Sequence, residues 1–101
     1  MFYLTSCGLD NNVTVYNLGK EGWSNIELNA GGVELETDQL KSQGSHTFLF
    51  DSEKEGCGHI IGELIGENYG INFGYFTPNM DTHYEIFLED NGSIRCKQII
   101  K

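Results

Sequence analysis

Cys57 and His59 come closest, by residue type and spacing, to the components of a chemical site. A thiolate and an imidazole two positions apart could bind zinc if His46 or His83 completed the ligand set. Alternatively, Cys57 could act as a nucleophile with His83 as its base. Nothing in the sequence marks the remaining metal ligands or supports the nucleophilic pair. We therefore expect no catalytic residue, no metal and no cofactor, and we interpret these side chains as ordinary strand and turn residues.

Glycine recurs at every fourth position in one stretch of the chain: Gly58, Gly62, Gly66, Gly70 and Gly74. A phosphate-binding loop would end in Lys followed by Ser or Thr, and would lead from a strand into a helix. This stretch has neither feature. The spacing instead predicts bends, bulges or a close approach between strands, with a groove over the bare glycines as the alternative.

Carboxylates are abundant and unevenly distributed. Fifteen acidic residues against six basic ones give a formal net charge of -9. Ten of the acidic residues, with only two lysines, lie between Glu21 and Glu67. Such a charge repels nucleic acids and anionic membranes and favours a basic protein as the partner.

Alternation along a strand beginning at Val33 would place Glu34 and Glu36 on one exposed face. A second group of carboxylates follows the apolar run 48–50. We expect these groups to form one acidic surface that steers a basic protein into contact, with aromatic side chains as buried anchors. The aromatic residues considered for that role are Trp23, Tyr69, Tyr75 and Phe76. The expected partner-binding residues are Glu34, Glu36, Asp38, Asp51, Glu53, Glu55, Glu63, Glu67 and Tyr69.

In size, acidity and lack of catalytic motifs, the chain resembles the small bacterial immunity proteins of contact-dependent growth-inhibition toxin systems. The resemblance implies a cytoplasmic protein that is not an enzyme. It further implies that a monomer binds one cognate toxin, such as a basic nuclease or ribonuclease, and abolishes its activity.

Two other interpretations remain open at this stage. One is a phage-type mimic of nucleic acid that occupies the DNA channel of a defence complex. The other is a small barrel that binds a ligand or performs hydrolysis through Cys57, His59 or His83.

The compartment is inferred from three features. The amino-terminal residues show no secretory signal pattern, and no apolar run approaches the roughly 20 residues that a membrane-spanning helix needs. Cys7, Cys57 and Cys96 are an odd number at wide spacing, which favours reduced thiols. We expect a cytoplasmic protein that contacts no membrane.

The elements that would position these residues are short strands. We predict a single domain over residues 1–101, all-β and mainly antiparallel. Its architecture would be a β-sandwich or partly open barrel of about eight short strands. Strands are expected near residues 2–7, 13–18, 23–28, 33–36, 46–50, 59–65 and 71–76, with a loop over 66–70. At most one helical turn is expected, at 38–41.

The carboxyl-terminal segment gives the most specific structural prediction. Alternating runs at 82–89 and 93–100 flank Asp90-Asn91-Gly92, which indicates a hairpin. A two-residue loop would mix polar and apolar faces. A three-residue loop with Gly92 in the left-handed conformation instead opposes Leu88 to Ile94, and the later pairs follow in register.

Overall fold

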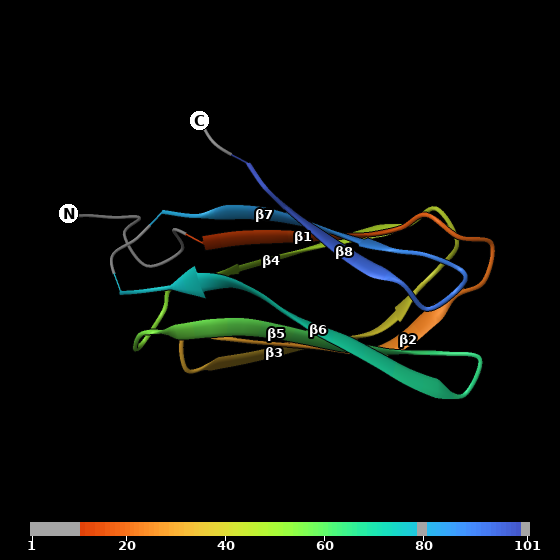
Figure 1. Cartoon of the computed structure of the whole chain (residues 1–101), viewed down its shortest axis with the longest axis horizontal. Helices are drawn as coiled ribbons and strands as arrows, with labels where there is room; N and C mark the ends of the chain where they lie inside the picture. The colour runs from red at the N-terminus through yellow and green to blue at the C-terminus, as the bar shows by residue number, and fades with distance from the viewer. Residues whose placement is uncertain (1–10, 79–80, 100–101) are drawn as a thin grey trace.

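A computed structural model describes residues 11–78 and 81–99 of the chain. Within these residues it contains eight strands and no helix (Figure 1). The strands are β1 (Asn11–Asn17), β2 (Trp23–Ala30), β3 (Val33–Leu40), β4 (Ser45–Phe50), β5 (Gly56–Leu64), β6 (Glu67–Phe76), β7 (His83–Leu88) and β8 (Ile94–Gln98). The predicted strand over residues 2–7 lies outside the described residues.

The strands form two four-stranded sheets that face each other as a sandwich. One sheet has the order β4-β1-β7-β8 and the other has the order β3-β2-β5-β6. All neighbouring strands are antiparallel except β1 and β7, which are parallel. The all-β, mainly antiparallel prediction is confirmed, and of the two architectures expected the chain adopts the sandwich.

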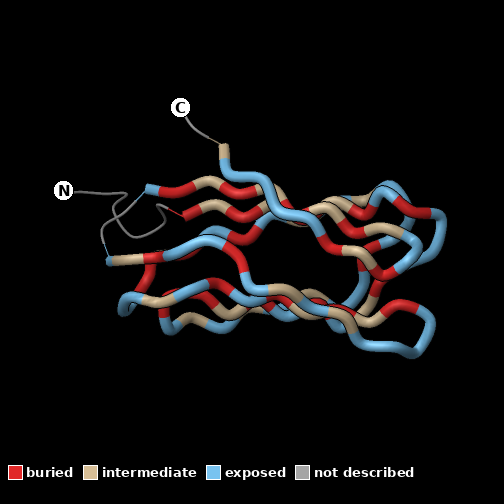
Figure 2. Tube along the Cα trace, viewed as in Figure 1, coloured by how far each residue is buried: buried red, intermediate tan, exposed pale blue. Residues whose placement is uncertain are grey.

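Apolar side chains at alternate positions build the core between the sheets. Along β1 every second residue is buried, from Asn11 to Asn17, as the alternating colours of Figure 2 show. Aromatic rings fill one part of this core, where Phe76 packs against Phe50, Phe73 and Tyr84 with ring centroids 5.3–5.9 Å apart. Removing this apolar surface from water stabilises the sandwich by roughly 25 cal/mol for each Å² buried.

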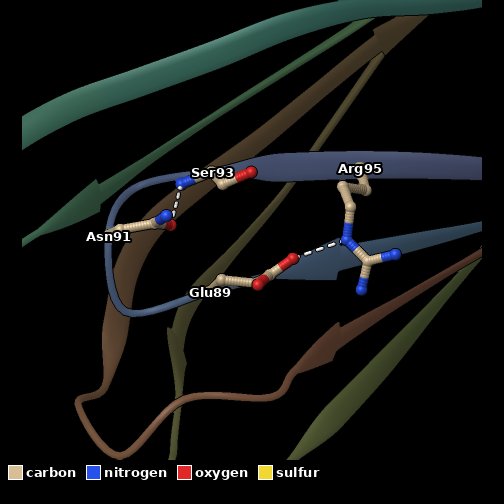
Figure 3. Close-up of polar contacts among 4 residues, drawn as sticks. All are labelled: Glu89, Asn91, Ser93 and Arg95. Atoms are coloured by element: carbon tan, nitrogen blue, oxygen red, sulfur yellow. Dashed lines mark hydrogen bonds and ion pairs between the residues drawn. The ribbon is translucent and has the colours of Figure 1, made fainter.

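The predicted carboxyl-terminal hairpin is confirmed, including its register. Leu88 pairs with Ile94 across β7 and β8, and Gly92 has a φ of 85°. The Ser93 amide donates a hydrogen bond to the Asn91 side-chain oxygen at 2.9 Å, which closes the loop (Figure 3). Local turn chemistry and strand alternation therefore determine this element.

Two local predictions are wrong. Residues 67–70 belong to β6 and form no loop, because Leu64 pairs with Glu67 around a two-residue turn at Ile65 and Gly66. Residues 38–40 are the end of β3 and form no helical turn. Leu40 pairs with Trp23 and is buried in the core, so packing in the sheet overrides the local helical preference.

The glycine series provides turns, a bulge and close approaches, as predicted. Gly74 lies in β6 with a φ of 63°, where the pairing of β5 with β6 shifts by one residue. A Cβ atom at this position would lie 2.6 Å from Cζ of Tyr84. Gly74 therefore combines a left-handed conformation with a contact that excludes any side chain.

Gly74→Ala is expected to lower the free energy of unfolding by about 2–5 kcal/mol, measured by urea denaturation. A left-handed conformation costs an ordinary residue about 1–2 kcal/mol, and crowding against a packed ring adds about 1–3 kcal/mol. Gly56→Ala is the matched control, because a Cβ there meets no atom within 4 Å. Its effect should stay within about 0.5 kcal/mol. Equal losses in the two variants would contradict this role of Gly74.

Candidate protein-binding surface

The sheet β3-β2-β5-β6, here called the acidic sheet, carries most of the charge found on strands. Its strands contain six carboxylates and no Lys or Arg. The strands of the other sheet contain one carboxylate, one Arg and one Lys. The two outer surfaces of the sandwich therefore differ in charge, which the amino-acid totals alone do not show.

Strand alternation directs five of these carboxylates outward. Glu27 lies between the buried residues Ile26 and Leu28 on β2, so its side chain points away from the core. The same alternation exposes three positions on β3 and partly exposes one on β5. We call these five residues the acidic face: Glu27, Glu34, Glu36, Asp38 and Glu63.

The acidic face brings like charges together. Glu27 is directly opposite Glu36 in the pairing of β2 with β3. Cβ atoms of such partners lie about 4.5–5.5 Å apart, and like charges at this spacing destabilise a sheet. No Lys or Arg forms an ion pair with either carboxylate among the described residues. This repulsion is therefore uncompensated within the described part of the chain.

The ion pair found among the described residues lies elsewhere. Nε of Arg95 on β8 is 2.5 Å from Oε2 of Glu89 (Figure 3). The guanidinium of Arg95 also lies 5.3 Å from the ring centroid of Phe87. The Arg95 guanidinium, on the other sheet, is therefore already in contact with Glu89 and Phe87 of the same chain.

A bulge in β2 shapes one end of the acidic face. Asn25 has a φ of 49°, which Asn tolerates better than most residues, and the pairing of β2 with β5 shifts between Ser24 and Glu27. Asn25 Nδ2 donates a hydrogen bond to Glu63 Oε1 at 2.7 Å. The bulge thus holds the Glu63 carboxylate in a defined position beside Asn25.

An open groove lies next to this bulge, between β2 and β3. Its volume is about 760 Å³, and its lining residues are Ser24, Asn25, Thr37, Asp38, Gln39 and Lys41. Hydroxyl, amide and carboxylate oxygens can accept hydrogen bonds from a cation, and planar guanidinium groups pair well with carboxylates. The groove therefore offers hydrogen-bond acceptors to a polar side chain, while its one carboxylate, Asp38, is matched by the ammonium of Lys41 on the same lining.

The structure divides the predicted binding residues into three groups. Glu34, Glu36, Asp38 and Glu63 belong to the acidic face. The residues Asp51, Glu53 and Glu55 lie in the loop between β4 and β5. This loop contacts the β2–β3 turn, because the Glu53 amide donates a hydrogen bond to the Gly31 carbonyl at 2.8 Å. The loop thus lies at one end of the acidic sheet.

Glu67 and Tyr69 form the third group, at the β5–β6 turn on the opposite end of the acidic sheet (Figure 1). The Tyr69 ring packs toward the core, 5.8 Å from the ring centroid of Trp23. Its hydroxyl donates a hydrogen bond to Glu67 at 2.9 Å, and this bond raises the pKa of Tyr69. Tyr69 thus lies on the inner side of the sheet, away from the acidic face.

Two aromatic residues expected as anchors are core residues. Trp23 is 1% exposed and Phe76 is fully buried, so neither can reach a partner. Tyr75 is 52% exposed, and its hydroxyl donates a hydrogen bond to Glu55 at 3.1 Å. The expectation failed because sequence proximity to acidic residues does not say which face of a strand an aromatic residue occupies.

Glu27 is a member of the acidic face that the sequence reasoning missed. The signal was available, because Ile26 and Leu28 flank it in the pattern of a half-buried strand. Applying the alternation rule to β2 as well as to β3 would have placed Glu27 on an exposed face.

The candidate chemical residues are distributed over both sheets. Cys57 and His59 lie exposed on β5, whereas His46 and His83 belong to β4 and β7 of the other sheet. Within residues 11–78 and 81–99, there is no group of three or more His, Cys, Asp or Glu side chains that could hold a metal ion. The same part of the chain has no helix long and apolar enough to cross a membrane.

The outer surface of the other sheet contains an aromatic pair with a titratable member. Tyr16 stacks on Phe87 with ring centroids 5.5 Å apart, and its hydroxyl donates a hydrogen bond to Glu85 at 3.2 Å. Burial, followed by the charge and hydrogen bond of Glu85, raises the pKa of Tyr16 above the usual 10.0. Tyr16 thus holds its proton more tightly in the folded protein than in the unfolded chain.

The contribution of protonated Tyr16 to the stability of the folded protein is fully present below pH 10.0. It is lost as the pH rises through the pKa that Tyr16 has in the folded protein. Glu85→Gln should lower the pKa of Tyr16 without restoring the ordinary value, because burial remains. A pH titration of the Tyr16 ring signals by NMR measures this shift. An unchanged pKa in the variant would contradict the assigned contribution of Glu85.

Comparison with known proteins finds structures of similar fold but no matching family. No family model matches the chain, and no curated protein matches it. An NMR structure of a protein from Eubacterium rectale is similar, with a TM-score of 0.62 and 20% sequence identity. The similarity covers 90% of this chain and 89% of that one.

The crystal structure of a candidate cell adhesion protein from Bacteroides ovatus is also similar. The TM-score is 0.58 at 6% sequence identity, and the similarity covers 92% of this chain and 44% of that chain. At such low identities, the two likenesses establish the shared fold alone.

Proposed function

We propose that the chain is an inhibitor that binds a basic protein through its acidic face and neutralises it. The observation that supports this most is the pairing of Glu27 with Glu36, with no cation beside them on the acidic sheet. Opposed like charges cost a sheet up to about 1 kcal/mol. A partner that supplies Lys or Arg at this face would convert that repulsion into attraction.

The class of partner follows from the same chemistry. Nuclease active sites use cationic residues to hold phosphate, so a surface of fixed carboxylates can occupy or cover them. The groove beside Asn25 and Asp38 would receive one polar side chain of the partner through its hydrogen-bond acceptors. Together with the resemblance to immunity proteins, this favours a basic nuclease toxin bound one-to-one in the cytoplasm.

Affinity capture from the organism that encodes the chain tests this proposal. The tagged chain should retain a basic protein at low salt and at physiological salt. That protein should show nuclease activity, which the chain then suppresses in a purified assay. The proposal fails if no basic protein is retained under either condition, or if the retained protein keeps its full activity in the complex.

A further inference from the structure

Ile65 occupies the tip of the β5–β6 hairpin in an unusual state. Its side chain is 75% exposed, and its φ is 50°. Gly66 follows with a φ of 79°, and Leu64 pairs with Glu67 around these two residues. Positive φ at both central positions is typical of a type I′ turn, in which Asn, Asp or Gly is preferred at the first position.

An isoleucine at this position does not help the fold. A β-branched residue in the left-handed conformation is strained. The strain lowers the folding equilibrium constant by about tenfold. The exposed side chain also gains little from burial in the core. A residue that is both strained and exposed, where Asn would satisfy the turn, indicates a role outside the fold.

The surroundings of Ile65 indicate which partner surface would receive it. Carboxylates at Glu63 and Glu67 flank the tip, and Glu63 belongs to the acidic face. Figure 1 shows the turn at one end of the sandwich, where a partner can reach it. An apolar tip between carboxylates is complementary to an apolar pocket with a basic rim.

We propose that Ile65 inserts as an anchor into an apolar pocket, rimmed by Lys or Arg, on the basic protein that binds the acidic face. The inference rests on the proposed function for the identity of that protein. A second copy of this chain is a poor occupant, because its net charge of -9 would repel the carboxylates around the tip. A basic partner benefits from charge attraction at the rim and from apolar burial at the centre.

Ile65→Asn separates the two roles, because it creates the preferred Asn-Gly turn while it removes the apolar side chain. We expect the melting temperature to rise by about 4–8 °C, since relief of about 1 kcal/mol has this effect in a domain of this size. The dissociation constant for the basic protein retained in the capture experiment should rise by about 30-fold, as for a typical anchor residue. Ile65→Leu keeps an apolar side chain and should retain most of the affinity.

Leu49→Asn is the matched control, because Leu49 is also exposed, at 51%, but lies on β4 of the other sheet. It should not raise the melting temperature, and it should leave the affinity for the basic protein unchanged. If Ile65→Asn lowers the melting temperature, or binds as tightly as the unmodified chain, the inference is wrong. If Glu36→Lys abolishes binding while Ile65→Asn does not, the anchor fails and the proposed function stands.

Photo-crosslinking tests the anchor without a measurement of affinity. A diazirine analogue of leucine is placed at position 65 or at position 49, and each chain is irradiated in a lysate of the encoding organism. The inference predicts an adduct with a basic protein from position 65 only. Equal labelling from the two positions, no labelling, or an adduct with an acidic protein would overturn it.

Discussion

Replacing both Glu36 and Asp38 with Lys should slow association with the basic partner by about tenfold to a hundredfold at low salt. Electrostatic steering accelerates association by about 10 to 1,000 times, and this double substitution reverses the field where the carboxylates are densest. Stopped-flow measurement of the association rate constant tests the prediction. The difference should shrink as salt increases, because the Debye length falls from about 10 Å at 0.1 M to about 3 Å at 1 M.

The control for this variant changes net charge equally but on other surfaces. Glu21→Lys with Asp81→Lys alters the β1–β2 and β6–β7 loops, away from the strands of the acidic face. We expect a much smaller decrease in the association rate. Equal decreases in the two double variants would mean that total charge, and not the acidic face, guides the encounter.

Unfolding would not explain slower association in the Glu36→Lys, Asp38→Lys variant. Glu36→Lys replaces the like-charge pair with Glu27 by a pair of opposite charges. Such a pair favours the sheet by about 0.2–1 kcal/mol, so the variant should be at least as stable as the unmodified chain. Urea denaturation verifies this before the kinetic comparison.

Trp23→Ala should lower the free energy of unfolding by about 3–5 kcal/mol, the usual range for removing a large buried aromatic side chain. Trp23 is 1% exposed, and its ring packs so closely on Gly62 that a Cβ atom there would be 2.9 Å away. The loss is a large part of the roughly 5–15 kcal/mol that stabilises a small domain. Urea denaturation measures it directly.

The same variant distinguishes a core role from a binding role for Trp23. The fraction of Trp23→Ala that remains folded should associate with the partner at an unchanged rate. Tyr75→Ala is the exposed control and should leave the urea midpoint unchanged. A Trp23→Ala variant that keeps its stability but loses affinity would mean that Trp23 is a partner-binding anchor after all.

The sequence predicts elements well where local chemistry and long-range packing agree. At the carboxyl-terminal hairpin, the loop ending in Gly92 and the alternation of β7 and β8 require the same register. At the β5–β6 hairpin, local chemistry and strand pairing conflict, because Ile65 is not a turn residue and Gly70 is a poor strand residue. The predicted loop followed the glycines, whereas the actual turn follows the pairing of Leu64 with Glu67.

The candidate site was only partly predictable for a related reason. Alternation within one strand places Glu34 and Glu36 together, and the structure shows these two residues on one face of β3. Which strands lie side by side depends on sheet order, which sequence patterns do not specify. The pairing of Glu27 with Glu36 results from that order. Glu67 is separated from the β4–β5 loop because the whole of β5 runs between them.

The central claim is that the acidic face binds the partner, and an NMR footprint of the complex tests it most directly. Backbone amide shifts of the labelled chain are recorded with and without the basic protein. We predict that the largest changes map to Glu27, Glu36 and Asp38 and to the bulge at Asn25. Changes centred on Tyr16, Phe87 and Arg95 of the other sheet, with the acidic face unaffected, would contradict the claim.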